Sequence, residues 1–281
     1  MMAESNISKS AYSESKAMAP VHIPDEAMVQ RAHHEAHQRA IESEIAAQAP
    51  TGARENCAVL LNEYKDNPAF HNKINQLCSK YAGIRRSRGD GNCFYRSVAF
   101  QLLDGLRDQP AEIIERVRKQ HSDVLEGLVG TLGYDRFTAE DFFEAFAEAV
   151  MEMPSKSIAD LETMFGDDHG SMYYIYWIRL VTSFSIQAQP EKFAPFIMAM
   201  NFPDPASFCK SQVEPSKVDA DQLPIQALAE HMRISIRIEY LDGRSDEPLN
   251  HHDFGPTLGS GLAKVFLLYR PGHYDMLLDP L

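Results

Sequence analysis

The hydrophobic pattern changes its period about two thirds of the way along the chain. Up to about residue 200 the apolar residues recur with helical spacing, and segments 94–106 and 171–184 are apolar almost all round, as buried helices are. From Ile234 the sequence ISIRIEY alternates, and the later runs KVFLLY and HYDMLL have the pattern of short strands. Helices first and strands last predict an α+β fold, with a helical body around a small, mostly antiparallel sheet.

Further helices are expected in the first two thirds of the chain. Thr138 stands three residues before Asp141, which predicts a capping-box start for one of them. The expected ranges are 58–81 with an interruption near Pro68, 110–128, 138–150 and 191–200.

Three regions differ in composition. Residues 1–24 are rich in Ser, Ala, Lys and Glu, and we expect a disordered tail. Residues 25–48 contain strong helix formers with only a thin apolar stripe, which predicts a helical arm that serves as a partner-binding element or docks loosely. Pro50 and Gly52 are expected to end this arm, and we expect residues 49–281 to form one globular domain.

Charge and composition exclude several classes of protein. The net charge is −13, and the one compact basic run, Arg85, Arg86 and Arg88, is too short for a nucleic-acid surface; we expect it to pair with acidic neighbours. The sequence shows neither a transmembrane-length apolar stretch nor a secretory signal. Four cysteines without a C-x-x-C pair predict a reduced protein, and we expect it in the cytoplasm, with the nucleus as a second location.

The sharpest local signal is the turn Gly89-Asp90-Gly91-Asn92 before Cys93. The glycines permit a tight turn with positive φ, and Asn92 is expected to cap the following helix. Cys93 then occupies the first helical position, where free N–H groups and the helix dipole favour a thiolate. These N–H groups, with that of Asp90, predict an oxyanion hole. The alternative is an ordinary helix start with a buried, inert cysteine.

A base for such a thiol must come from elsewhere in the sequence. His273 and Asp275 are two residues apart on an expected strand, so their side chains point to one face. We expect Asp275 to accept from the Nδ1–H of His273, which leaves Nε2 to face the thiol. The alternative is a surface histidine beside a solvated carboxylate.

The motifs GDGNCFYRS and YRPGHYDMLLDP resemble those of the otubain branch of the OTU (ovarian tumour) cysteine deubiquitinases. The resemblance extends to VEP around Glu214, IRIEYLD around Tyr240 and NHHDF from Asn250, and the arm resembles that of the longer otubains. It implies a papain-like OTU fold, with Cys93 as nucleophile, His273 as general base and Asp275 as the group that orients it. Asp90 matches an aspartate whose backbone helps to form the family's oxyanion hole.

The resemblance also implies a function. The expected reaction is hydrolysis of isopeptide bonds in polyubiquitin, with preference for lysine-forty-eight linkage, and it requires no cofactor or metal. The expected partners are ubiquitin and polyubiquitin chains, with a ubiquitin-charged conjugating enzyme bound through residues 25–48, and the protein is expected to be a monomer. The alternative function is non-catalytic: the chain binds charged conjugating enzymes and so inhibits ubiquitination. A papain-like protease of general substrates is a weaker third interpretation.

Two other features remain. Within residues 218–228, Gln222 and Pro224 replace histidines that are common in the family, which puts affinity for the distal ubiquitin in question. The histidine groups 33–37 and 251–252 match no strong metal motif, since the pattern H-E-x-x-H is missing. We therefore expect no metal site.

Overall fold

The computed structural model describes residues 26–242, 248–258 and 261–280, and the tail expected at 1–24 lies outside these ranges. The chain divides into two units, residues 1–43 and 44–281. Helix α1 (Glu26–Ala46) lies mostly in the first unit and continues across its boundary. Nearly all of its described side chains are exposed, as its polar sequence predicts. None of the helices described is long and apolar enough to cross a membrane.

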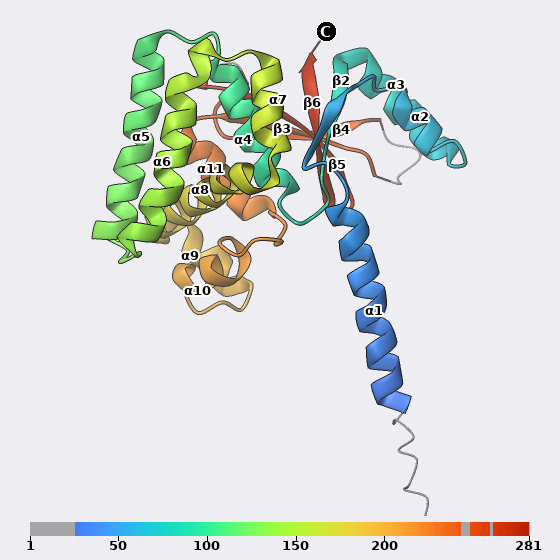
Figure 1. The fold of residues 1–281 in the computed structure, drawn as a ribbon, viewed down its shortest axis with the longest axis horizontal. Coiled ribbons are helices and arrows are strands. Elements are labelled where there is room, and N and C mark those ends of the chain that lie inside the picture. The colour runs from blue at the N-terminus through green and yellow to red at the C-terminus, as the bar shows by residue number, and fades with distance from the viewer. Residues whose placement is uncertain (1–25, 243–247, 259–260, 281) are drawn as a thin grey trace, which may run out of the picture. The chain divides into compact units, whose positions relative to one another are not determined.

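A six-stranded sheet runs through the second unit in the order β1-β2-β6-β5-β3-β4 (Figure 1). All neighbouring strands are antiparallel except β3 and β5, so the sheet is mostly antiparallel, as expected. The strands are β1 (Thr51–Glu55), β2 (Tyr81–Ser87), β3 (Ser235–Tyr240), β4 (Asn250–Phe254), β5 (Lys264–Arg270) and β6 (His273–Pro280).

The helical body contains one central helix, α4, whose side chains are buried on almost every side. Helices α5 and α6 lie side by side, and α6 and α7 both pack against α8. The helices and 3₁₀ turns are α2 (Val59–Glu63), η1 (Pro68–Phe70), α3 (His71–Lys80), α4 (Cys93–Leu106), α5 (Ala111–Gly130), α6 (Arg136–Glu152), η2 (Met153–Ser155), α7 (Ile158–Gly166), α8 (Asp168–Gln187), α9 (Pro190–Ala199), α10 (Pro205–Gln212) and α11 (Gln222–Met232).

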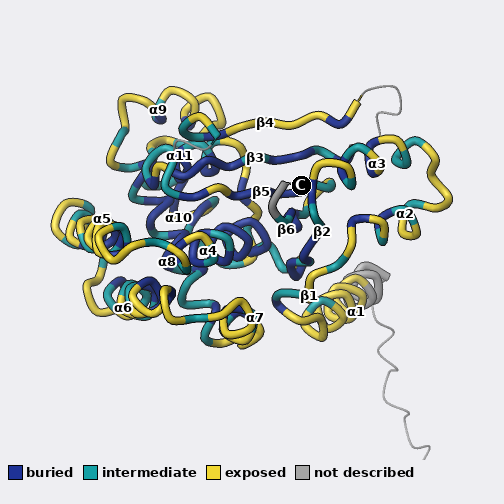
Figure 2. Tube along the Cα trace, turned by 90° about the horizontal axis from the view of Figure 1, so that it is seen from above, coloured by how far each residue is buried: buried dark blue, intermediate teal, exposed yellow. Residues whose placement is uncertain are grey.

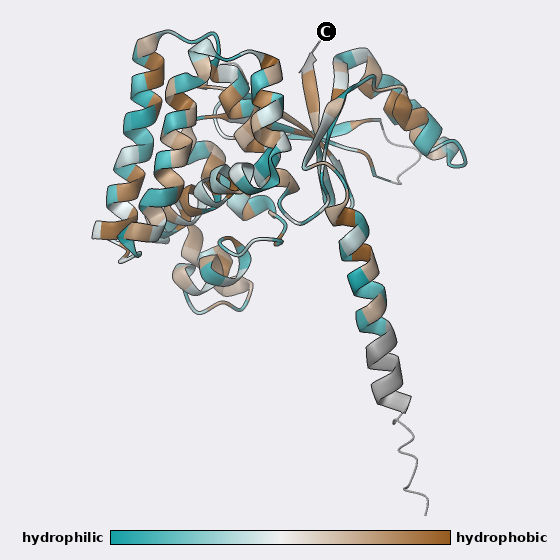
Figure 3. Ribbon diagram, viewed as in Figure 1, coloured by the Kyte–Doolittle hydropathy of each residue, from teal (hydrophilic) through white to brown (hydrophobic). Residues whose placement is uncertain are grey.

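The sheet separates two hydrophobic cores, because alternate residues of each strand point to opposite faces. On β5, Val265 and Leu267 join the core of the helical body around α4, whereas Phe266 and Leu268 join a smaller core under α2 and α3. Figure 2 shows the central strands buried and the edge strand β4 exposed. In Figure 3, α2 and β6 carry hydrophobic residues, drawn in brown, in agreement with this second core.

Several elements differ from the sequence-based expectation. The range expected as a helix to residue 81 ends at Lys80, and β2 follows directly. Strands β1, β2 and β4 were not expected from the sequence pattern. Helix α6 begins earlier than expected, because the carboxylate of Asp135, and not Thr138, caps it by accepting from the Thr138 N–H at 2.9 Å.

A close approach between α5 and α8 gives a test of this packing. A Cβ atom at Gly127 would lie 2.3 Å from the ring of Phe184, whereas a Cβ at Gly130 would meet nothing within 4 Å. We expect Gly127→Ala to lower the free energy of unfolding by roughly 1–3 kcal/mol through overpacking. Gly130→Ala, the matched control, should raise it by up to about 1 kcal/mol, because alanine favours the helix. Urea denaturation measures both, and equal stabilisation by the two substitutions would contradict the packing.

Candidate active site

The turn at residues 89–92 places Cys93 as the first residue of α4, where its side chain is 1% exposed. Gly91 has φ +75°, and a Cβ there would lie 2.4 Å from the backbone carbonyl of Lys217. Gly89 approaches His273, since a Cβ at that position would be 3.4 Å from the Nδ1 of the histidine. Gly91 is therefore required by its positive φ and its close backbone contact, whereas 3.4 Å at Gly89 is an ordinary van der Waals distance.

His273 reaches the same place from the other end of the sequence. The turn Pro271-Gly272 joins β5 to β6, and His273 is the first residue of β6. The N–H of Tyr274 donates to the Cys93 Sγ at 3.4 Å, and the His273 ring lies close enough to the Cys93 thiol for the two groups to interact. The structure thus brings together the two residues that the sequence singled out.

The expected ring orientation is wrong. His273 Nε2, and not Nδ1, is the nitrogen that donates to Asp275, at 2.9 Å from Oδ1. Nδ1 lies on the side of Gly89, towards the nucleophile turn. The spacing of two residues correctly predicts a shared face but says nothing about which ring nitrogen meets the carboxylate.

His273 is a strong base in this position. Burial alone lowers its pKa, but the hydrogen bond with Asp275 and the interaction with Cys93 outweigh burial and raise the pKa to about 9. The imidazole therefore carries a proton at neutral pH, so an imidazolium lies between the Asp275 carboxylate and the Cys93 side chain.

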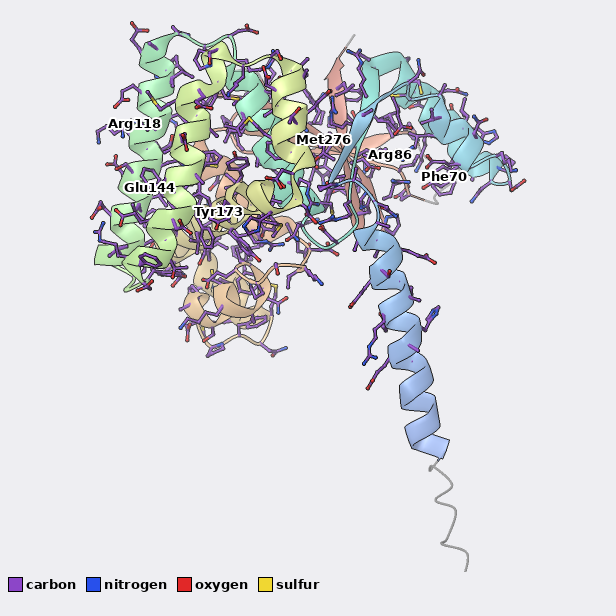
Figure 4. All side chains as sticks on the ribbon, viewed as in Figure 1. Phe70, Arg86, Arg118, Glu144, Tyr173 and Met276 are labelled. Atoms are coloured by element: carbon purple, nitrogen blue, oxygen red, sulfur yellow. The ribbon has the colours of Figure 1, made fainter. Side chains whose placement is uncertain are left out.

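Asp275 is completely buried, and its charge is compensated from three strands. Its Oδ1 accepts from the Ser87 N–H at 3.0 Å as well as from His273, and its Oδ2 accepts from Arg270. Arg86, labelled in Figure 4, lies 3.5 Å from the same Oδ2. Burial raises the pKa of Asp275, but His273, Arg270 and the Ser87 amide more than offset this, so the pKa lies below its ordinary value.

Asp90 does not face the thiol with its carboxylate. The carboxylate accepts two hydrogen bonds from the fully buried Arg96, at 2.9 and 2.7 Å, and one from Arg88 at 3.0 Å. Burial raises the pKa of Asp90, yet these arginines lower it to about 2. The Asp90 N–H donates to the Arg88 carbonyl at 3.0 Å, so this peptide must turn before it can join an oxyanion hole.

Asn92 occupies the N-cap position of α4, but its side chain does not cap the helix. Its Oδ1 instead accepts from Arg179 at 2.7 Å and from the Lys217 N–H at 3.2 Å. The expected capping bond is therefore wrong, and the cap position holds the turn against another segment. Arg179, in the middle of α8, carried no sequence signal because it stands within an apolar run.

The basic run at 85–88 pairs with acidic neighbours, as expected. Arg85 pairs with Glu162, and Arg88 pairs with both Asp90 and Asp168. Arg86 pairs with Glu55 and Glu63 in addition to its approach to Asp275.

Two open clefts flank the nucleophile turn. One, of about 370 Å³, is lined by Asp219, Ala220, Asp221 and Gln222 and by the rings of Tyr240, Tyr269 and Tyr274. The other, of about 410 Å³, lies against Asp90 and Asn92 and is also lined by Asp168, His169, Tyr176 and Lys217. Of the two family-divergent positions, Gln222 lines the first cleft, whereas Pro224 is buried in α11.

Other candidate residues have structural surroundings. Burial raises the pKa of Cys57 and of Cys209 to about 12, which keeps both as unreactive thiols. His252 packs against Tyr240, and Asp253 pairs with Arg237. The side chain of His33 lies outside the described residues, and within the described part no group of three His, Cys, Asp or Glu side chains could hold a metal ion.

The raised pKa of His273 predicts a pH-dependent stability. A histidine with a pKa of about 9 in the folded state and 6.5 otherwise stabilises fully below pH 6.5, and this contribution is lost as the pH rises through 9. We expect the free energy of unfolding, measured by urea titration, to fall as the pH rises from 6.5 to 9. In His273→Gln this fall should be smaller. His252→Gln, on the exposed strand β4, is the control that retains it. Equal slopes for wild type and His273→Gln would contradict the charge assignment.

Comparisons with known proteins identify relatives of this chain. The family model described as Peptidase C65 Otubain matches residues 43–279. The chain is 38% identical to human "Ubiquitin thioesterase OTUB1" over 245 residues, which are 86% of this chain and 88% of that protein. It is 36% identical to the Arabidopsis thaliana "OVARIAN TUMOR DOMAIN-containing deubiquitinating enzyme 1", over 85% of this chain and 84% of that one.

Solved structures show the same fold. The chain in "The structure of h/ceOTUB1-ubiquitin aldehyde-UBC13~Ub" superimposes with a TM-score of 0.78 at 31% identity, over 89% of this chain and 98% of that one. A second structure, described as h/ceOTUB1 with ubiquitin aldehyde and UBCH5B~Ub, has the same TM-score at 30% identity. The α+β architecture is thus the papain-like OTU fold, and the chain belongs to the otubain family, peptidase family C65.

Proposed function

We propose that this protein is a cysteine-type ubiquitin hydrolase that cleaves isopeptide bonds in polyubiquitin. The observation that carries this proposal is the convergence of Cys93, His273 and Asp275, from the start of α4 and the start of β6, in a family whose relatives are named ubiquitin thioesterases. A thiol next to an imidazole that a carboxylate orients is the arrangement that nucleophilic cysteine catalysis requires.

Each residue has a distinct step in the proposed reaction. The Cys93 thiolate attacks the carbonyl carbon of the C-terminal glycine of ubiquitin, and the imidazolium of His273 donates its proton to the leaving lysine amine. His273 then takes a proton from water, which attacks the thioester and releases ubiquitin with a free carboxylate. Asp275, through Nε2, holds the ring with Nδ1 towards the thiol throughout.

The negative oxygen of each tetrahedral intermediate requires donors near Cys93. The Cys93 N–H is one, because the first N–H groups of a helix have no partner within the helix. The Asp90 N–H becomes the second donor once its peptide turns away from the Arg88 carbonyl. The anchored Asp90 carboxylate limits how far this turn of backbone can move.

An exposed apolar site supports a folded protein as substrate. Phe196, on α9, is 64% exposed, and Met200, the C-cap residue directly after this helix, is 40% exposed. Their spacing of four positions places them one helical turn apart. Neighbouring exposed apolar side chains of this kind can form part of a contact surface for a protein partner when they belong to a contiguous patch. This fits recognition of the body of ubiquitin in addition to its tail.

The second candidate function is the binding of ubiquitin-charged conjugating enzymes without catalysis. It is supported by the solved relatives, whose descriptions include UBC13 or UBCH5B charged with ubiquitin. Under this proposal the helix at 26–46 holds the second ubiquitin, and the same arm gives the catalytic function its preference for lysine-forty-eight linkage. Both functions are compatible with one chain, because binding through the arm does not require the side chains of Cys93, His273 and Asp275.

Cleavage of a panel of di-ubiquitins under reducing conditions tests the catalytic proposal. We expect the wild type to cleave, with lysine-forty-eight-linked di-ubiquitin fastest, and Cys93→Ala to lose at least about a thousandfold in rate because it lacks the nucleophile. Cys209→Ala, a buried cysteine outside the site, is the matched control and should retain activity. If wild type cleaves no linkage while it still binds a charged conjugating enzyme, the second function replaces the first.

The arm has its own test. Deletion of residues 1–48 should raise the KM for lysine-forty-eight-linked di-ubiquitin more than it lowers kcat, because the arm contributes binding and leaves the triad intact. A single-ubiquitin substrate with a fluorogenic leaving group is the control and should be hydrolysed equally with and without the arm. Identical kinetics of the two proteins on di-ubiquitin would exclude the proposed role.

A further inference from the structure

Arg179 is a completely buried cation whose hydrogen-bond acceptors are neutral. Within the described part of the chain its guanidinium donates to the carbonyl oxygens of Gly91 (2.8 Å), Val213 (2.8 Å) and Val218 (3.0 Å), and to the side-chain oxygen of Asn92 (2.7 Å). Two of these acceptors belong to the nucleophile turn and two to the segment 213–218, so one side chain joins both.

Such a charge is costly to bury, and the other buried arginines avoid that cost. Arg96 has the carboxylate of Asp90 as its partner, and Arg85 has that of Glu162. Arg179 has no carboxylate among the hydrogen-bond partners described above, and burial lowers its pKa. A role limited to packing would not require a positive charge at this position.

The surroundings of the charge indicate what it acts on. The guanidinium lies over the ring of Tyr95, 4.0 Å from its centre. Its electrostatic neighbours are Tyr95, Tyr176, Asp90, Asp219 and Cys93. Asp90 stays ionised through Arg96 and Arg88, and burial keeps Tyr95 protonated because it raises the pKa of that phenol. Cys93 is the neighbour whose charge must change during the proposed reaction.

We propose that Arg179 is a positioning residue that clamps the nucleophile turn to segment 213–218 and favours the thiolate of Cys93 with its buried positive charge. The two effects act through different properties of the side chain. Two hydrogen bonds hold the nucleophile turn at Gly91 and Asn92, next to Cys93, and two more hold segment 213–218. The charge acts over distance in a region of low dielectric. The inference rests on the proposed role of Cys93 as nucleophile.

The test separates charge from hydrogen bonding and requires no ubiquitin in its first arm. Iodoacetamide reacts with thiolates, so its rate constant at Cys93, followed by peptide-resolved mass spectrometry across pH 6–9, reports the thiolate population. The variants are Arg179→Gln and Arg179→Met, which are neutral, and Arg179→Lys, which keeps the charge but cannot reach all four acceptors. The matched controls are Arg85→Gln and Arg85→Lys at an equally buried, ion-paired arginine.

We expect both neutral variants to alkylate Cys93 about tenfold more slowly than wild type at pH 7, and to shift the profile to higher pH. Arg179→Lys should stay within about threefold of wild type in alkylation. With a fluorogenic ubiquitin substrate it should lose about tenfold or more in kcat at unchanged KM, because the turn is no longer clamped. The Arg85 variants should leave alkylation unchanged even where they lower the melting temperature.

Wild-type alkylation in Arg179→Gln, or an equal loss in Arg85→Gln, would overturn the proposal. If neither neutral variant folds, Arg179→Lys alone tests the proposal. Retained alkylation of Cys93 with a reduced kcat supports the clamp. A variant in which both the alkylation rate and kcat fall, or in which neither falls, contradicts it. A wild type that alkylates as expected but cleaves no ubiquitin substrate would refute the proposed function and leave the electrostatic inference standing.

Discussion

The buried carboxylate of Asp275 is the constraint on which the site and the middle of the sheet depend. An ionised carboxylate without contact to water is tolerated only when its charge and its lone pairs are all compensated. Here the partners come from β2, β5 and β6, through the Ser87 amide, Arg270 and His273. The strand order β2-β6-β5 is therefore the arrangement that lets this charge exist and lets it hold the imidazole.

The sequence predicts the fold class and the main residues of the site, but not the buried contacts that hold them in place. The change from helical to alternating period identifies the α+β class, and the tight turn before Cys93 and the spacing of His273 and Asp275 identify the two halves of the site. Strand β2 escaped detection because Arg85 and Arg86 suggest an exposed charged run, whereas their charges are neutralised by carboxylates that lie far away in the sequence. Local patterns cannot show partners that only the tertiary fold supplies.

The same reason explains the errors at the nucleophile turn. Asparagine before a helix usually caps it, and here a tertiary donor, Arg179, competes successfully for its side-chain oxygen. The Asp90 amide was expected to be free, and it is bonded to the Arg88 carbonyl. Two buried arginines thus hold the turn through hydrogen bonds: Arg96 on the nucleophile helix itself and Arg179 on the neighbouring α8.

The separation in sequence between Asp275 and its partner Ser87 also determines when the site can form during synthesis. Ser87 and Asp275 are 188 residues apart in sequence, yet their atoms meet in the centre of the sheet. At a synthesis rate of about 5–20 residues per second, roughly 10–40 seconds pass between the translation of one and of the other. During that interval the nucleophile helix can form, but the histidine and its carboxylate do not yet exist. A nascent chain is therefore without its imidazole base until β6 has been made and has inserted between β2 and β5.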